Sequence, residues 1–141
     1  MANAIYPKTK EKFLNPGTLG TTSGTAVDMV DDTIKIALID TGVYTYNAAN
    51  EFYSSASAAA IGTPQTLGTK TVTNGVFDAA DVTFTSVTGA SVEALIIYKD
   101  TGTAATSSLV AYIDVVASGL PVTPNGGNIT ITFNASGIFA L

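Results

Sequence analysis

Much of the chain alternates apolar and polar residues at every second position. TIKIALI over 33–39 places Ile34, Ile36 and Leu38 on one face, and NITITF over 128–133 alternates in the same way. Because successive side chains of a strand point to opposite faces, both segments predict β-strands with a face in the core.

Further runs rich in β-branched and aromatic residues also predict strands. EALIIY over 93–98 is apolar on both faces, which is typical of a strand in the interior of a sheet. The other runs are KTVT over 70–73, DVTFTSV over 81–87 and SLVAYIDVV over 108–116. The chain therefore contains enough strands for an all-β domain.

Turn-forming residues separate the runs. Asn74-Gly75 predicts a type I′ hairpin, because both central residues of that turn need positive φ. The segment AANEFYSSASAAA over 48–60 has a mixed composition, and we expect an irregular excursion with one or two helical turns. Short strands between such turns predict a single antiparallel β-sandwich or a partly closed barrel.

The beginning of the chain differs from the rest. PKTKEKFL over 7–14 predicts a short helix, with proline first and Asn-Pro-Gly at its end. Residues 17–27 are rich in Gly, Thr and Ser and predict a flexible connector. The expected organisation is an extended or short-helical N-terminal arm and connector over 1–27, followed by a β-sandwich domain over 28–141. The arm is either a frayed terminus or a segment that docks on a neighbouring subunit.

Composition limits the chemistry that the chain can perform. Its 141 residues predict one domain with a substantial core, and they include no Cys, His, Trp or Arg. Without His, catalysis by Ser-His-Asp or Cys-His groups is excluded. Without Cys, there is no disulfide and no thiolate metal site. We therefore expect no enzyme activity, no catalytic residue and no cofactor.

Charge narrows the classes of partner. The formal charge is −5, and only 12% of residues are charged. An acidic chain without Arg is poorly suited to bind nucleic acid, and no run has the length of a membrane span or the pattern of a signal peptide. We expect a soluble protein made without a secretion signal, with no nucleic acid, membrane or small-molecule substrate as partner. A partly neutral surface indicates that neighbouring subunits cover it.

Two Asp-Thr-Gly tripeptides raise the question of an aspartic protease, in which paired DTG loops hold two carboxylates together. Asp40-Thr41-Gly42 follows an apolar run, but Lys99 precedes the second tripeptide, Asp100-Thr101-Gly102. A two-lobed enzyme also needs about twice this length. We interpret both tripeptides as strand-ending turns, in which Asp accepts backbone hydrogen bonds and Gly takes positive φ. A protease that uses Asp40 remains a remote alternative hypothesis.

Two pairs of acids have the oxygen ligands that Ca²⁺ prefers, namely Asp31-Asp32 and Asp78 with Asp81. Neither pair has the spacing of a calcium loop. We place the first pair at the start of a strand and the second in a surface turn, and we expect no metal. No glycines have the spacing of a phosphate-binding loop.

Aromatic and apolar residues supply candidate contacts with other subunits. Tyr44 and Tyr46 lie two residues apart on an extended segment, and Tyr is favoured at interfaces. Tyr98 and Tyr112 lie on neighbouring predicted strands and are expected to pair across them. Packing in the core is the alternative role for these tyrosines. The candidate contact residues are Ile5, Tyr6, Phe13, Leu14, Tyr44 and Tyr46.

Five segments carry a likeness to known proteins. They are, in order, MANAIYPKTKEKFL, DDTIKIALIDTGVYTYN, GVFDAADVTFTSVTG, EALIIYKDTGTAATSSLVAYID and GLPVTPNGGNITITF, and they cover more than half of the chain. With these segments, the chain resembles a family of small structural proteins of tailed-bacteriophage virions. It departs from the family in a longer Gly/Thr/Ser insert at 17–27 and in an Ala/Ser run at 54–60.

The resemblance implies a protein incorporated in the phage particle after synthesis in the bacterial cytoplasm. Members look like capsid cement or decoration proteins on the outside of the shell. The implied partners are the major capsid protein and further copies of the chain, as a dimer or trimer, and the candidate contact residues would face them. A tail, neck or head-fibre-associated structural role is the alternative. The resemblance brings no catalytic residue and no cofactor.

Overall fold

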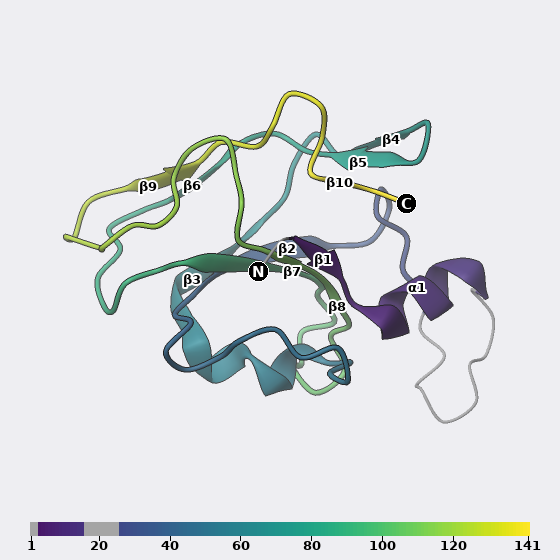
Figure 1. Cartoon of the computed structure of the whole chain (residues 1–141), viewed down its shortest axis with the longest axis horizontal. Helices are drawn as coiled ribbons and strands as arrows, with labels where there is room; N and C mark the ends of the chain where they lie inside the picture. The colour runs from purple at the N-terminus through teal and green to yellow at the C-terminus, as the bar shows by residue number, and fades with distance from the viewer. Residues whose placement is uncertain (1–2, 16–25) are drawn as a thin grey trace.

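The computed structural model describes residues 3–15 and 26–141, and these are mostly antiparallel β-structure with one short helix (Figure 1). The largest sheet has the order β1-β8-β7-β2-β3. The sheets do not close into a barrel, so the all-β prediction is confirmed without the barrel alternative. The strands of the largest sheet are β1 (Ala4–Ile5), β2 (Ile34–Ile39), β3 (Ala60–Thr66), β7 (Ala94–Lys99) and β8 (Leu109–Ile113).

Two smaller sheets lie together over one face of the five-stranded sheet (Figure 1). Asn74 and Gly75 have φ of 52° and 78°, so the hairpin between β4 and β5 turns as the sequence predicts. The three-stranded sheet consists of β10 (Phe139–Ala140), β5 (Val76–Asp78) and β4 (Thr71–Thr73), and the two-stranded sheet of β6 (Val82–Phe84) and β9 (Ile129–Ile131).

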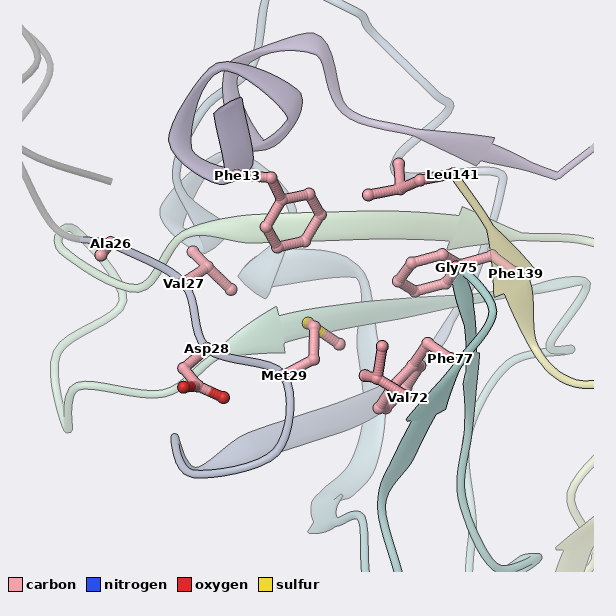
Figure 2. Close-up of a pocket in the computed structure, with 10 residues that line it drawn as sticks. All are labelled: Phe13, Ala26, Val27, Asp28, Met29, Val72, Gly75, Phe77, Phe139 and Leu141. Atoms are coloured by element: carbon pink, nitrogen blue, oxygen red, sulfur yellow. The ribbon is translucent and has the colours of Figure 1, made fainter. Parts of the chain in front are cut away.

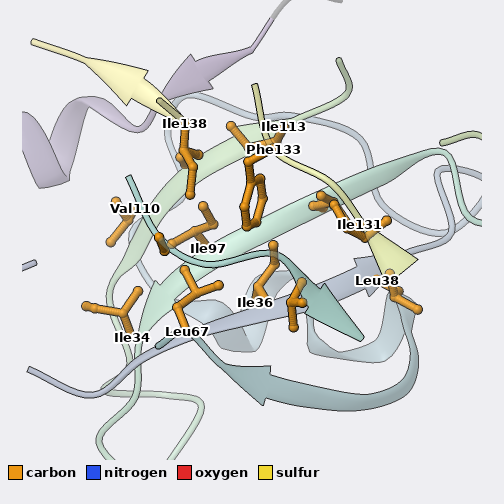
Figure 3. Packing of buried hydrophobic residues seen from close by; sticks show 14 of the residues in the cluster. Ile34, Ile36, Leu38, Leu67, Ile97, Val110, Ile113, Ile131, Phe133 and Ile138 are labelled. Atoms are coloured by element: carbon orange, nitrogen blue, oxygen red, sulfur yellow. The ribbon is translucent and has the colours of Figure 1, made fainter. Parts of the chain in front are cut away.

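Strand β2 divides its side chains between two cores. Ile34, Ile36 and Leu38 are fully buried between the five-stranded sheet and the smaller sheets (Figure 3). Ala37 and Ile39 are fully buried on the opposite face. Each isoleucine or leucine contributes roughly 1.5–3 kcal/mol on burial. The alternation predicted from the sequence is therefore confirmed, and both faces of the strand are covered.

The second core is covered by the segment that follows β2. It contains two 3₁₀ turns, η1 (Tyr53–Ser55) and η2 (Ser57–Ala59), which confirm the expected irregular excursion with short helical turns. The Tyr53 ring stacks on Tyr98 at 3.9 Å between centroids. In the strand register Tyr98 lies opposite Leu109, so the expected pairing of Tyr98 with Tyr112 is wrong.

Strand β3 was not predicted from the sequence. It contains Gly62 and Pro64, which both argue against a strand interior. The structure accommodates them because β3 is the outermost strand of its sheet, and its register against β2 shifts between Ile36 and Leu38. An irregular edge tolerates a residue that cannot donate to the ladder.

The N-terminal segment is part of the domain in the described structure. The predicted helix is confirmed as α1 (Pro7–Leu14), with proline in its first turn. Strand β1 pairs with β8, and Tyr6 is completely buried. The sequence led us to expect an arm over 1–27, either frayed or docked on a neighbouring subunit, whereas residues 3–15 pack on the domain of the same chain. Residues 16–25, most of the expected connector, lie outside the described residues.

Candidate functional site

Two of the six candidate contact residues belong to the interior. Tyr6 and Tyr44 are buried, and their hydroxyl oxygens are 2.9 Å apart. Tyr44 also donates to Asn50 Oδ1 at 3.0 Å. Burial raises the pKa of both tyrosines above the ordinary value of 10.0. Both side chains lie in the second core, and for Tyr44 this is the packing role considered as the alternative to a subunit contact.

Tyr46 connects this buried pair to the surface. Its ring is half-buried and lies 5.1 Å from the Tyr6 ring and 5.8 Å from the Tyr112 ring, measured between centroids. It lines a surface hollow together with Ile5, another candidate contact residue. The structure therefore brings Ile5 and Tyr46 together from segments that are far apart in the sequence.

A second hollow of about 380 Å³ contains a further candidate residue, Phe13 (Figure 2). Phe13 points from α1 toward Phe139 and Leu141 of the C-terminal segment. The hollow lies among α1, segment 26–29, the β4–β5 hairpin and β10. Its lining is mostly apolar: Phe13, Ala26, Val27, Asp28, Met29, Val72, Gly75, Phe77, Phe139 and Leu141.

The two hollows adjoin each other, because Phe139 lines both of them. The hollow that contains Ile5 and Tyr46 has a volume of about 500 Å³. Helix α1 contributes Pro7 and Lys10 to it, and Phe13 to the other. These helix residues are three apart and so follow one side of the helix. We call the pair of hollows the α1–β10 groove.

Helix α1 is a fixed wall of this groove because a buried lysine anchors it. Lys12 is completely buried and forms an ion pair of 2.9 Å with Glu51. Its ammonium also donates to Ser108 Oγ at 2.7 Å and lies 5.0 Å from the centre of the Phe52 ring. One turn earlier, the Thr9 hydroxyl donates to the Leu109 carbonyl.

Among the described residues that line the groove, one side chain is a cation and one is an anion. Lys10 is exposed and lines the larger hollow, whereas Asp28 is exposed at the smaller one. The backbone N–H groups of Asp31 and Val30 lower the pKa of Asp28, so this carboxylate is ionised at neutral pH. An occupant of the groove thus meets an apolar surface with a cation at one end and an anion at the other.

Leu14, the last of the six candidates, lies at the end of α1. It does not line the groove, and 86% of its surface is exposed. The structure therefore brings Ile5, Phe13 and Tyr46 into one groove and places Tyr6, Leu14 and Tyr44 elsewhere.

The wall of the groove opposite α1 was not predicted from the sequence. Phe139, Ala140 and Leu141 come from the last residues of the chain, and Met29 comes from the segment before β2. The apolar ending IFAL was a signal for burial or contact. This apolar ending did not indicate that α1 would face it.

The two DTG tripeptides form the turns that the sequence predicts. Asp40 Oδ1 accepts from the Gly42 N–H at 2.7 Å, and Asp100 Oδ1 accepts from the Gly102 N–H at 3.1 Å. Gly102 has a φ of 86°, whereas Gly42 is not among the residues with positive φ. The expected glycine conformation is therefore present in the second turn and absent from the first.

The two turns lie at opposite ends of one strand pair. Asp40 follows β2 and Asp100 follows β7, and these strands are antiparallel over six residues. At about 3.3 Å per residue, the carboxylates lie roughly 20 Å apart. They cannot share a proton within one chain, so the two tripeptides of one chain do not form the carboxylate dyad of a two-lobed aspartic protease.

The carboxylates near both turns bind other groups of the same chain. Asp100 forms an ion pair with Lys35 at 2.9 Å, and this contact lowers the pKa of Asp100. Glu93 Oε2 accepts from the N–H and the hydroxyl of Thr41 at 3.1 and 3.0 Å. Hydrogen bonds lower the pKa of Glu93; the one from Ser91 has the largest effect, and those from Thr41 have smaller ones. These acids stabilise the turns.

Three of the four acids considered as calcium ligands bind other groups of the fold. Asp32 forms an ion pair with Lys99 at 2.9 Å. Asp78 accepts from the Ala79 N–H, and Asp81 from the Phe133 N–H at 3.0 Å. Across 3–15 and 26–141, no three carboxylates converge as a metal site requires.

Comparison with models of known protein families gives no match, and comparison with curated proteins finds none of significant sequence similarity. Within the described part of the chain, no helix has the length and apolar character needed to cross a bilayer. The groove is therefore interpreted from its own residues.

Proposed function

We propose that this chain is a structural protein of a bacteriophage virion, and specifically a capsid cement or decoration protein. In this role its layered β-sheets act as a rigid sandwich that binds the outer shell and bridges neighbouring capsid subunits. The observation that carries the proposal is the α1–β10 groove, which gathers Ile5, Phe13 and Tyr46 at the surface of a low-charge chain. The sequence resemblance supplies the phage context.

The groove suits a large apolar side chain of the major capsid protein. The smaller hollow is open and mostly apolar, and Leu141 at its edge is 68% exposed. A single such contact is weak, but a shell repeats its binding site many times. A protein that bridges two subunits gains affinity because its second contact forms at high effective concentration.

The test compares two aspartate substitutions at positions of similar exposure. Leu141→Asp places a charge in the groove, whereas Val43→Asp places the same charge at a site that is 61% exposed and outside the groove. Both variants are expected to fold, which circular dichroism checks. We expect Leu141→Asp to lower binding to purified shells at least about tenfold, since an unpaired charge in an apolar contact costs more than 1.4 kcal/mol. Val43→Asp should bind normally.

Mass spectrometry of purified virions tests the role apart from the groove. A copy number comparable to that of the major capsid protein supports the shell. A small copy number, set by one ring or one fibre, supports the tail, neck or head-fibre alternative. Absence of the chain from virions contradicts both roles. Equal binding by the two aspartate variants contradicts the groove but leaves the virion role intact.

A further inference from the structure

Strand β4 forms one edge of the three-stranded sheet, and the described residues place no strand on its outer side. Thr71, Val72 and Thr73 are all exposed, and Val72 is 53% exposed. The strand has no charged residue and no proline. An edge of this kind presents free backbone donors and acceptors to another strand.

The hairpin determines which backbone groups point outward. Asn74-Gly75 is a two-residue turn, so the pair that closes it, Thr73 and Val76, exchanges hydrogen bonds. The next pair, Val72 and Phe77, then turns its N–H and C=O groups away from the other strand. Phe77 agrees with this alternation, because its carbonyl accepts from the Ile138 N–H on the side away from β4, at 2.8 Å.

Other edges of the two larger sheets are less suitable for pairing. Strand β3 carries Pro64 and an irregular register. Strands β1 and β10 have only two residues each, and Pro7 follows shortly after β1. Prolines, irregular registers and short strands are the usual protection of an edge. Strand β4 has none of them except its modest length of three residues.

We propose that β4 pairs with β4 of a second copy, antiparallel and about a two-fold axis through Val72. Val72 is suited to this position because its outward N–H and C=O match the C=O and N–H of the same residue in the second copy. A two-fold contact uses one surface on both partners. The result is a continuous six-stranded sheet with the order β10-β5-β4-β4-β5-β10. We expected a dimer or a trimer, and a two-fold contact of this kind forms a dimer.

The register places Thr71 of each copy opposite Thr73 of the other. The two Val72 side chains lie beside each other on the face that carries the smaller hollow of the groove, because Val72 lines that hollow. The Thr71 and Thr73 side chains lie on the opposite face, since strand side chains alternate. The proposal does not rest on the virion role, because the dimer can form in solution without a shell.

Charge pairs at the two threonines test this register. Thr71→Lys with Thr73→Lys sets like charges opposite each other twice, whereas Thr71→Lys with Thr73→Glu sets opposite charges there twice. Cross-strand charge pairs change stability in these directions. Sedimentation velocity up to millimolar protein should show a dimer for the natural chain and for the Lys/Glu variant. The Lys/Lys variant should dimerise at least about tenfold more weakly than the Lys/Glu variant.

A cysteine at the axis gives a second readout. The chain contains no cysteine, so Val72→Cys can form a disulfide only with a second copy. The Cα atoms of a hydrogen-bonded pair lie about 5.5 Å apart, within the range that a disulfide spans. Mild oxidation should yield a covalent dimer from Val72→Cys and little from Val115→Cys, whose side chain is also exposed but lies outside β4.

Three results would overturn the proposal. The first is a monomeric natural chain at millimolar concentration. The second is equal dimerisation of the Lys/Lys and Lys/Glu variants. The third is equal cross-linking through the two cysteine positions. Each of these measurements is made without virions, so a negative result here does not bear on the virion role.

Discussion

At the scale of single residues, Lys12 decides how the N-terminal segment lies. In the sequence it is one of three lysines in a short polar stretch, and such lysines are mostly solvated. In the structure it is completely buried, with its charge matched by Glu51 and its ammonium hydrogen-bonded to Ser108. Lys8 makes an exposed ion pair with Glu11 on the same helix.

The two lysines should therefore differ in their effect on stability. We expect Lys12→Met to lower the free energy of unfolding by about 3 kcal/mol, because it leaves the Glu51 carboxylate largely buried without its partner. Lys8→Met removes an exposed pair and should change stability by less than about 1 kcal/mol. Urea denaturation of both variants measures the difference. Equal effects would show that Lys12 is not buried as described.

At the scale of elements, β1 and α1 complete the fold. Strand β1 pairs with β8, and the Tyr6 N–H donates to the Val110 carbonyl at 3.0 Å. Tyr6 itself fills the second core. Removing this segment exposes the edge of β8 and opens that core. It is therefore a structural element as well as one wall of the α1–β10 groove.

A truncation tests this role. We expect a chain that lacks residues 1–15 to unfold at much lower urea concentration than the full chain, or to aggregate, because the β8 edge and the second core become accessible. Leu14→Ser is the matched control, since this side chain is 86% exposed and its replacement should change little. If the truncated chain is as stable as the full one, the segment is the separate arm that the sequence suggested.

At the scale of the whole molecule, the second core depends on protonated tyrosines. It contains Tyr6, Tyr44, Tyr53, Tyr98 and Tyr112. Burial is the first cause of a raised pKa at each of them. A phenolate in this layer would lose its hydration without gaining a cation.

These shifts predict alkaline instability. Because the pKa values are raised in the folded state, the stability they provide is complete below pH 10 and is lost as the pH rises further. We expect tyrosinate absorbance and loss of circular dichroism to appear together above pH 10. The chain unfolded in guanidinium should titrate near 10. Ionisation of all tyrosines near pH 10 in a chain that keeps its structure would contradict this prediction.

Most of the secondary structure could be predicted from the sequence because it depends on neighbouring residues. The alternation in TIKIALI and the apolar run EALIIY determined β2 and β7, and Asn74-Gly75 determined a hairpin. The Asp-Thr-Gly turns could be predicted because the Asp carboxylate accepts a hydrogen bond from the backbone N–H two residues later. Strand β3 was missed because its Gly62 and Pro64 are acceptable only at a sheet edge.

The sequence by itself determined the β class, the interior strands and the absence of histidine and cysteine chemistry, since these follow from residue types and short-range periodicity. The tertiary structure alone decided that Lys12 is buried, that the two DTG turns lie at opposite ends of a strand pair, and that α1 faces β10. Those facts depend on strand order and register, which bring together residues about a hundred positions apart. Local patterns carry no information on such distant pairings, because many arrangements of the same strands satisfy them equally.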